Sequence, residues 1–469
     1  MQTRTVDVAI IGSGSAGLYA LSQVRRARKS FVLINGGEPG TTCARVGCMP
    51  SKAMIQVADD FHRRGHFGKY GISGHEHLRL DPGDAMEHVQ GLRDLFVERV
   101  LSHSTDKLGD EFIEDYARFI EPTLLEAGGQ QIRATRVIIA TGSRPLVPAA
   151  WRAFGKRIIT PDDFFEQESL PASIGVIGLG TRGLELGQSL QRFGVTVTGF
   201  DQLDTIGGLQ DPEVARTTIE VLGRELPLHL GHPATLEQDG DRLKITAGEL
   251  GVTVDQVLCS IGRVPNVQDL GLENLGIELD ANGLPAVNPT TMQVADLPVF
   301  MAGDVNGRRM LLHEAGDEGR IAGYNAAREE ITAFRRKTPL YINFCDPNIC
   351  IVGTRWNELD HEQTAVGETR FAPVGRAIIM GSNRGLLRVY GDRHSGRILG
   401  AEMIGPKGEN LAHLLCWCIE QQLTVGQLLR MPFYHPVIEE ALQAALYDLY
   451  GKVEASNSGG PIELERLPV

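Results

Sequence analysis

Short apolar runs alternate with amphipathic segments along the first part of the chain. The apolar run 6–11 leads into the glycine turn 12–17, a helical pattern continues to residue 27, and a second apolar run covers 31–34. Strand, glycine turn, helix and strand in this order are typical of a βαβ unit that binds a dinucleotide. The glycines of the turn are Gly12, Gly14 and Gly17.

The same pattern occurs a second time further along the chain. The apolar run 174–177 precedes a glycine turn and a helical pattern, and the apolar run 195–200 follows. In both copies 23 positions separate the first glycine from the residue that ends the second strand, Asn35 in one and Asp201 in the other. This internal repeat predicts two dinucleotide sites rather than two coincidental turns. The glycines of the second turn are Gly178, Gly180 and Gly183.

Three later apolar runs, which begin at residues 137, 257 and 299, also end in turns of small residues. In an open α/β sheet, ligands bind at the carboxyl ends of the strands. We therefore expect these turns to line the dinucleotide sites. The residues concerned are Gly142, Gly262, Gly303 and Asp304.

The pattern changes at residue 340. Strand-like runs at 376–380, 385–390 and 398–403 precede amphipathic helical patterns at 410–422 and 438–450, which predicts an α+β unit. At roughly 150 residues per domain, the 469 residues also suggest about three domains. The expected fold class is α/β, with two Rossmann-like dinucleotide-binding domains and a C-terminal α+β domain.

Composition and charge exclude several classes of protein. The formal net charge of −13 argues against nucleic acid or an anionic membrane surface as a partner. We find no apolar run of the roughly 18 to 20 residues that a membrane-spanning helix needs, and the first apolar stretch is too short for a signal peptide. Seven cysteines, an odd number, do not indicate the disulfide framework of a secreted protein. We expect a cytoplasmic protein with no membrane partner.

Two of the cysteines are candidates for redox chemistry. Cys43 and Cys48 follow the second strand, and Lys52 lies within a helical pattern that continues to residue 57. Thiols this close in sequence can form a disulfide, and a helix N-terminus with a nearby lysine stabilises the thiolate that exchange requires. Spacing alone leaves open two buried, inert cysteines. The two dinucleotide repeats favour the redox pair.

With these motifs the chain resembles the FAD-dependent pyridine nucleotide disulfide oxidoreductases, and among them most closely the dihydrolipoamide dehydrogenases. The resemblance covers essentially the full length and implies FAD in the first repeat and NAD in the second. It also gives names to the expected domains. Residues 1–147 and 265–337 would form the FAD-binding domain, 148–264 the NAD-binding domain, and 338–469 the C-terminal dimerisation domain.

The resemblance further implies roles for single residues. Cys43 would exchange with the substrate, Cys48 would face the flavin, and Lys52 would lie by the flavin and pair with Glu185. The residues implied at the FAD site are Gly12, Gly14, Gly17, Asn35, Thr42, Gly142, Gly303, Asp304, His313 and Ala315. Those implied at the NAD site are Gly178, Gly180, Gly183, Asp201 and Gly262.

His435 and Glu440 resemble the acid/base pair of this family, which acts across a dimer interface, so the resemblance implies a homodimer. An imidazole oriented by a carboxylate is suited to deprotonating a thiol near neutral pH. The spacing allows Pro436 to start a helix that carries Glu440 on an early turn. Without the family pattern, a His and a Glu at this spacing would more often be a structural feature of the start of a helix than a catalytic pair.

The residue that ends the second strand of the second repeat indicates whether the site binds NAD(H) or NADP(H). Asp201 falls where a carboxylate accepts hydrogen bonds from the adenosine ribose and repels a 2′-phosphate. The stretch 202–211 contains no Lys or Arg. We therefore expect NAD(H) rather than NADP(H). Asn35, its counterpart in the first repeat, stands where the family usually has Glu, and it hydrogen-bonds a ribose more weakly.

The implied function is the oxidation of protein-bound dihydrolipoyl groups with NAD⁺, but two departures leave the substrate open. Phe433 stands where dihydrolipoamide dehydrogenases usually have a second His, and Thr41 replaces a common glycine. The alternatives are an NAD(P)H-dependent reductase of another small disulfide, and a specialised lipoyl-carrier enzyme that acts as a subunit of a larger complex. A scaffold without catalysis is disfavoured, because both cysteines and the acid/base pair are present.

The remaining cysteines are expected to be structural. Cys345 and Cys350 repeat the spacing of the redox pair, so they are candidates for a second redox pair or for half of a metal site. No His ligand lies near them in sequence, which favours buried thiols. Cys259 lies in an apolar strand, and Cys416 and Cys418 lie in a helical pattern, so all three are expected in the core. No metal site is expected.

Overall fold

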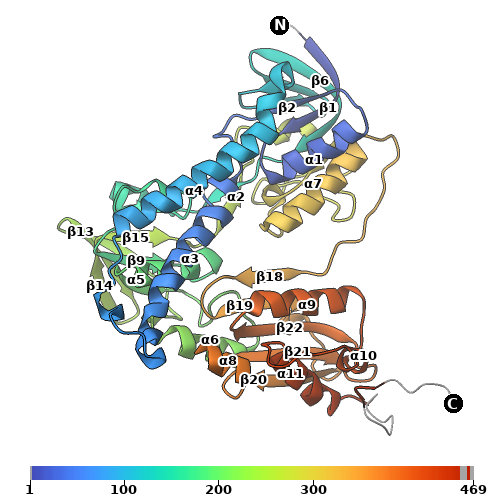
Figure 1. The fold of residues 1–469 in the computed structure, drawn as a ribbon. Coiled ribbons are helices and arrows are strands. Elements are labelled where there is room, and N and C mark those ends of the chain that lie inside the picture. Colours follow the sequence, from blue (N-terminus) through green and yellow to red (C-terminus); the bar gives the residue numbers. More distant parts are fainter. Residues whose placement is uncertain (1–2, 455–461, 465–469) are drawn as a thin grey trace, which may run out of the picture.

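The computed structural model describes residues 3–454 and 462–464, and its strands form three large sheets and two small ones. The first large sheet has the strand order β3-β2-β1-β6-β5-β4, with β17 beside β6. Figure 1 labels β1, β2 and β6 of this sheet. β1, β2, β3, β6 and β17 pair in parallel, whereas β4 and β5 are antiparallel additions. The bounds are β1 (Thr3–Ile11), β2 (Phe31–Ile34), β3 (Phe112–Ile113), β4 (Arg118–Glu121), β5 (Leu124–Ala127), β6 (Gln130–Ile139) and β17 (Val299–Met301).

Two helices from opposite ends of this unit lie side by side on the first sheet, α1 (Ser15–Arg26) and α7 (Leu312–Ala326) (Figure 1). The contact is close because α7 has glycines four positions apart on one face. A Cβ at Gly319 would lie 2.2 Å from the carbonyl oxygen of Ala16, and one at Gly323 would lie 2.4 Å from that of Ala20. The segment before residue 340 thus returns to the unit that the N-terminal strand begins.

The second large sheet is entirely parallel, in the order β11-β10-β9-β15-β8. An antiparallel sheet of β12, β13 and β14 accompanies it, and β7 and β16 form a separate antiparallel pair. The bounds are β7 (Ser143–Pro145), β8 (Ile158–Ile159), β9 (Ser173–Ile177), β10 (Thr196–Phe200), β11 (Leu228–His229), β12 (Thr235–Asp239), β13 (Arg242–Ala247), β14 (Leu250–Val254), β15 (Gln256–Cys259) and β16 (Arg263–Pro265), with helices α5 (Thr181–Arg192) and α6 (Pro212–Leu222).

The third large sheet is antiparallel, in the order β18-β19-β22-β21-β20, and α9 and α11 pack on it (Figure 1). A buried network fixes this unit to the second one. Arg388 Nη1 lies 2.7 Å from Asp211 Oδ1, and the Glu402 carboxylate accepts the Asp211 N–H at 2.9 Å. The bounds are β18 (Leu340–Asn343), β19 (Asn348–Gly353), β20 (Thr364–Arg370), β21 (Leu386–Asp392), β22 (Ile398–Gly405), α8 (Gly375–Met380), α9 (Gly408–Glu420), α10 (Val425–Leu429) and α11 (Glu440–Tyr450).

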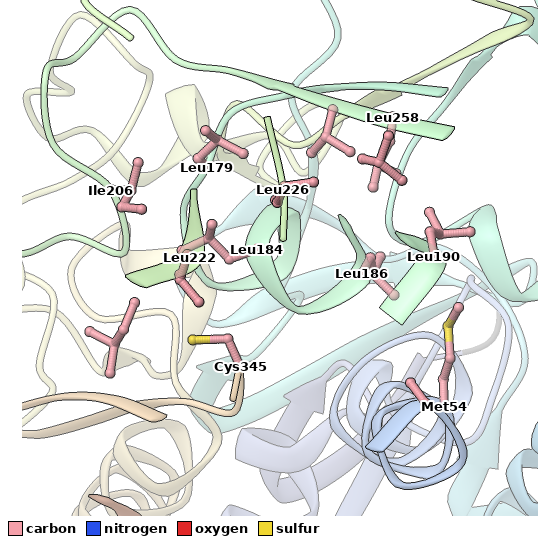
Figure 2. Close-up of a cluster of buried hydrophobic side chains, with 14 of the residues drawn as sticks. Met54, Leu179, Leu184, Leu186, Leu190, Ile206, Leu222, Leu226, Leu258 and Cys345 are labelled. Carbon is pink, nitrogen blue, oxygen red and sulfur yellow. The ribbon is translucent and has the colours of Figure 1, made fainter. Parts of the chain in front are cut away.

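Three further helices connect the first unit to the second: α2 (Thr42–Arg45), α3 (Cys48–Arg63) and α4 (Pro82–His103). Figure 2 shows the core that holds α3 against the second unit. Met54 of α3, Leu186 and Leu190 of α5, and Cys345 belong to one cluster of buried side chains. Burying side chains of this size stabilises each by about 1.5–3 kcal/mol relative to exposure. This packing fixes the position of the helix that begins with Cys48.

The structure confirms the expected α/β class, with two parallel nucleotide-type sheets and a third α+β unit. The expected strand at 376–380 is wrong, because residues Gly375–Met380 form α8, which ends at Gly381 with φ +71°. A short apolar run has no periodicity that separates helix from strand. The helix predicted at 438–450 begins at Glu440, so Pro436 does not start it. Within the described residues, no helix is both long and apolar enough to cross a membrane.

Candidate active site

Cys43 and Cys48 lie on two helices that follow each other directly. Cys43 is the second residue of α2, and Cys48 is the first residue of α3. Gly47 lies between the helices, where a Cβ would approach the carbonyl oxygen of Thr42 to 2.9 Å. The tight approach of α2 to α3 therefore favours a residue without a side chain, and it lets the Cys43 thiol donate a hydrogen bond to Cys48.

The two thiols differ in acidity. The hydrogen bond from Cys43 lowers the pKa of Cys48, and the nearby charges of Lys52 and Arg182 lower it further, against the effect of burial. The same hydrogen bond, together with burial, raises the pKa of Cys43. When the pair is reduced, the thiolate is therefore held on Cys48 and the proton on Cys43.

The cysteine pair lies between two cavities. Cys48 lines a cavity of about 800 Å³ together with Lys52, Arg182 and Glu185, and we call it the Cys48 cavity. Cys43 lines another of about 740 Å³, bordered by α1 and α4, which we call the Cys43 cavity. Each cavity reaches one cysteine of the pair and not the other. A disulfide at this position would link exchange in one cavity to electron transfer in the other.

Lys52 and Glu185 meet at the wall of the Cys48 cavity. The Lys52 ammonium lies 2.9 and 2.8 Å from the two carboxylate oxygens of Glu185, whose side chain is only 2% exposed. Glu185 also accepts the backbone N–H of Phe344 at 2.9 Å, and the ammonium lies 4.6 Å from the centre of the Phe344 ring. These contacts hold a positive charge in one place beside Cys48.

His435 and Glu440 form a hydrogen-bonded pair at the surface. His435 Nδ1 lies 2.8 Å from Glu440 Oε1, and the second carboxylate oxygen accepts the Val437 N–H at 3.1 Å. The hydrogen bond with His435 lowers the pKa of Glu440. The His435 side chain is 80% exposed, and the pair lines neither cavity. Within one chain, the structure does not bring this pair to the cysteines.

The glycines of the two repeats occupy matching positions. A Cβ at Gly12 would lie 2.3 Å from the carbonyl oxygen of Ala140, and one at Gly17 would lie 1.9 Å from that of Gly12. At Gly14 a Cβ would meet no described atom within 4 Å. The second repeat has the same pattern. A Cβ would lie 2.4 Å from the nearest backbone carbonyl oxygen at Gly178 and 1.9 Å from the nearest one at Gly183, and at Gly180 it would meet no described atom within 4 Å. The outer glycines are thus required by packing, and the middle one leaves room for a phosphate at the helix N-terminus.

The residues that end the second strands also match. Asn35 Oδ1 accepts the N–H of Ser13 at 3.2 Å, and Asp201 Oδ2 accepts that of Leu179 at 2.7 Å. The other Asp201 oxygen accepts the Leu203 N–H at 3.0 Å. Both side chains therefore lie beside a glycine turn, where a ribose hydroxyl is expected. A carboxylate is the stronger acceptor of the two.

The remaining residues predicted for the FAD site lie around the first repeat. Asp304 Oδ2 accepts a hydrogen bond, 2.8 Å long, from the hydroxyl of Ser143, the residue that follows Gly142. Gly303 has φ +81° and donates its N–H to Glu318 at 2.8 Å. Thr42 begins α2, His313 lines the Cys48 cavity, and Ala315 packs near Gly303. Gly262, which was predicted for the NAD site, lines the Cys48 cavity as well. A Cβ at Gly303 would lie 2.8 Å from Ala16 of the first glycine turn, and His313 lines the same cavity as Cys48, which fits FAD.

Sequence analysis missed a charged cluster on the wall of the Cys48 cavity. Asp162 Oδ1 lies 2.7 Å from Arg182 Nη1 and 2.8 Å from Arg263 Nη1. Both arginines line the cavity. Arg182 was visible in the sequence as a charge inside the second glycine turn, and Arg263 follows Gly262. Asp162 carries no motif, so only the fold reveals it.

The two departures from the family pattern have different surroundings. Thr41 has φ +62°, a conformation that favours glycine, and its hydroxyl caps α2 by accepting the Ala44 N–H at 3.2 Å. It lines the Cys43 cavity. Phe433 packs against the core of the third unit instead of extending the His435 pair. Of the two, Thr41 therefore has the direct contact with the Cys43 cavity.

The other cysteines are largely as expected. Cys345 and Cys350 are buried, burial raises the pKa of each, and the Cys345 thiol donates to the Pro347 carbonyl oxygen at 3.1 Å. Cys259 is also buried. Cys416 and Cys418 are only half-buried, and Cys416 faces the Cys48 cavity, which corrects their placement in the core. Among the described residues, no cluster of side chains is arranged to hold a metal ion.

Comparison with known families adds to this geometry. Residues 6–319 match the pyridine nucleotide-disulphide oxidoreductase family, and residues 340–446 match the dimerisation domain of the same family. The curated relatives include a dihydrolipoyl dehydrogenase of Thermus scotoductus, 29% identical over 95% of this chain and 98% of that protein. A dihydrolipoyl dehydrogenase of Bacillus subtilis is 28% identical over 95% and 98%.

Solved structures share the fold at lower sequence identity. The flavoprotein disulfide reductase RclA of Escherichia coli, in its Cu(II) complex, superposes with a TM-score of 0.83 at 21% identity, covering 96% of this chain and all of that one. LpdA of Mycobacterium tuberculosis superposes with a TM-score of 0.82 at 22% identity, covering 95% and 99%. The chain therefore shares its overall fold with these two proteins.

Proposed function

Because the chain belongs to the pyridine nucleotide-disulphide oxidoreductase family, we propose that it oxidises dithiols of the dihydrolipoyl class with NAD⁺. The observation that carries this proposal is the Cys43–Cys48 pair between two cavities, each of which reaches one sulfur. A dithiol can exchange on the Cys43 side while the electron pair leaves on the Cys48 side. The names of the curated relatives support this class of dithiol.

Exchange begins when a base takes a proton from the dithiol and the resulting thiolate attacks the sulfur of Cys43. The Cys43–Cys48 bond breaks, and Cys48 leaves as a thiolate, which its lowered pKa favours. The second substrate thiol then attacks the substrate sulfur bound to Cys43 and passes its proton to the Cys43 sulfur that leaves. The substrate departs as a disulfide, and two electrons remain on the cysteine pair.

The two glycine turns fit the cofactors that this function needs. When bound, FAD and NAD⁺ supply the acceptors for the electron pair. For FAD we propose the first repeat with Asn35, Thr42, Asp304 and His313, and for NAD⁺ the second repeat with Asp201. The open space at Gly14 and Gly180 supports both assignments. Two backbone N–H groups already hold the Asp201 carboxylate toward the second turn, which supports NAD(H) over NADP(H).

We propose that the base is His435 of a second copy of the chain. Within one chain the His435–Glu440 pair lines neither cavity, and the match to a dimerisation domain supports a homodimer. Glu440 holds Nδ1 of the imidazole, so Nε2 is left to take the proton of the thiol. Such a site is complete only in the dimer.

An NAD(P)H-dependent reductase of another disulfide is the second candidate. The observation that favours it is the wall of the Cys43 cavity, where Thr41 departs from the usual glycine. The exchange steps run equally well in reverse, so both candidates use the same residues. They differ in substrate and in the direction of electron flow.

The test is the reduction of NAD⁺ by dihydrolipoamide and by dihydrolipoate with the purified flavoprotein. Turnover with either dithiol that disappears in Cys43→Ser is the expected result. If neither dithiol is oxidised while NADH reduces the flavin, the lipoyl assignment fails and the second candidate replaces it. Loss of NADH-driven flavin reduction as well would contradict the assignment of the two nucleotide sites.

A further inference from the structure

The Cys43 cavity is walled by one face of α1 and one face of α4. Its residues follow each other at helical spacing on both helices, so each helix presents a continuous strip to the cavity. The part of the wall made by Leu18, Phe96, Val100 and Leu312 is apolar. It suits a hydrocarbon arm that carries the dithiol toward Cys43.

The charged part of the wall is entirely basic. Arg25, Arg99, Arg320 and His103 line the cavity, and among the described residues no Asp or Glu does. This is unexpected in a chain with a formal net charge of −13. A cavity lined by one sign of charge focuses the field on its contents and attracts the opposite charge.

Two of the three arginines lack a compensating charge. Arg320 forms an ion pair with Asp317 at 3.1 Å and lies over the Tyr19 ring at 4.0 Å. Within the described residues, Arg25 and Arg99 have no ion-pair partner, and both side chains are exposed. Arg25 lies two helical turns after Leu18 on α1, and Arg99 lies between Phe96 and Val100 on α4, so both cations border the apolar part of the wall and neither is bound by a described carboxylate.

We propose that the preferred substrate of the Cys43 cavity is a small dithiol whose apolar arm ends in a carboxylate. The inference rests on the proposed function and names its substrate more closely. The arm lies along the apolar strips with its sulfurs toward Cys43, and the carboxylate lies by Arg25 and Arg99. A substrate that ends in an amide, such as a lipoyl group linked to a carrier protein, is uncharged at that end and cannot form an ion pair with these two arginines.

Arg25 also has a simpler role available. It lies in the last turn of α1, where a positive charge stabilises the helix dipole. Arg26 shares this role on the same turn, is exposed, and does not line the cavity. Arg26→Gln is therefore a matched control, because it removes an equal charge from the same helix end.

The experiment compares kcat/KM for dihydrolipoate and dihydrolipoamide, which have the same dithiol and arm and differ only in the end group. We expect wild type to favour the acid by at least about fivefold at low salt. Arg25→Gln and Arg99→Gln should each lower this ratio by about two- to fivefold, while Arg26→Gln leaves it unchanged. Added salt should lower the wild-type ratio, because it screens exposed charges.

The outcomes separate this inference from the function on which it rests. If both dithiols are oxidised with equal kcat/KM, or if all three arginine variants change the ratio alike, the carboxylate preference is overturned and the lipoyl function stands. A preference for the amide also overturns it and favours a carrier-bound lipoyl group. If neither dithiol is oxidised, both the function and the inference fail.

Discussion

Lys52 of α3 and Glu185 of α5 form a two-oxygen ion pair, at 2.9 and 2.8 Å, between segments that lie 133 positions apart in the chain. The Glu185 side chain is buried and the Lys52 side chain is one-third exposed, at the wall of the Cys48 cavity. The pair therefore joins the helix that begins with Cys48 to the helix of the second glycine turn. It links the redox pair to the proposed nicotinamide site.

Glu185→Gln should weaken this link while keeping the shape of the side chain. The amide oxygen can still accept the Phe344 N–H, but the Lys52 ammonium loses its charged partner. We expect a loss of about 1–2 kcal/mol in the free energy of unfolding, measured by urea denaturation of the holoenzyme. Flavin reduction by NADH, followed by stopped flow, should also slow.

Glu220→Gln is the control for this change, because it breaks an exposed ion pair with Arg216 on α6. It should alter stability by less than about 0.5 kcal/mol and leave flavin reduction unchanged. Equal effects of the two variants would show that the Lys52–Glu185 pair has no special part in the site.

The pH dependence of the reduced enzyme should follow Cys48. Its thiolate is present above its lowered pKa and is lost as the pH falls through that value, so the long-wavelength thiolate-to-flavin band should fade only well below pH 8.5, about the pKa of a free thiol. Arg182→Gln removes one of the charges that lower the pKa, while Asp162 keeps Arg263 as a partner. The midpoint should then rise by about half to one pH unit.

Arg144→Gln is the matched control for the pH titration. Arg144 is exposed, binds Asn266 and Gln268, and does not line the Cys48 cavity. Its variant should keep the wild-type midpoint. If the midpoint is unchanged in Arg182→Gln, Arg182 does not lower the pKa of Cys48.

A mixed dimer tests whether His435 acts on the Cys43 of the other subunit. One subunit carries His435→Gln and the other Cys43→Ser, with two different tags so that the heterodimer can be purified. The His435→Gln homodimer should lose about 10²–10⁴-fold in dithiol oxidation, and the Cys43→Ser homodimer should show no turnover. If the site is shared, the heterodimer keeps one complete site and about half of the wild-type rate. An inactive heterodimer would place the whole site within one chain.

Alanine substitutions at two glycines of the first turn should have different effects, one on FAD binding and the other on folding. At Gly14 an added Cβ meets no described atom within 4 Å, so Gly14→Ala should fold but release FAD on gel filtration. At Gly17 the Cβ would lie 1.9 Å from the Gly12 carbonyl oxygen, so Gly17→Ala should lose soluble expression. Full FAD retention by Gly14→Ala would contradict the assignment of this turn.

Local patterns were sufficient to predict the nucleotide-type units. The apolar run at Phe31–Ile34 coincides with β2, and both glycine turns open a helix, because the packing of each turn depends on residues within one βαβ unit. The Lys52–Glu185 contact was implied only by the family resemblance. Spacing in one sequence carries no information on a contact between such distant segments.

Features assembled from several distant segments could not be predicted. Asp162 joins Arg182 and Arg263 through side chains from three parts of the chain. The Cys43 cavity combines helices α1 and α4, whose lining residues show no motif when each helix is considered alone. The strand expected at 376–380 failed for a different reason, since so short a segment has no periodicity that separates a helix from a strand.

The central claim is that Cys43 faces the substrate and Cys48 faces the flavin, and the spectra of two oxidised variants test it most directly. In Cys43→Ser the Cys48 thiolate remains, with a serine hydroxyl in place of the thiol that donates to it and with Lys52 and Arg182 nearby. This variant should show the long-wavelength thiolate-to-flavin band without any reductant, and Cys48→Ser should show none. A band in Cys48→Ser and not in Cys43→Ser would reverse the two roles and contradict the account.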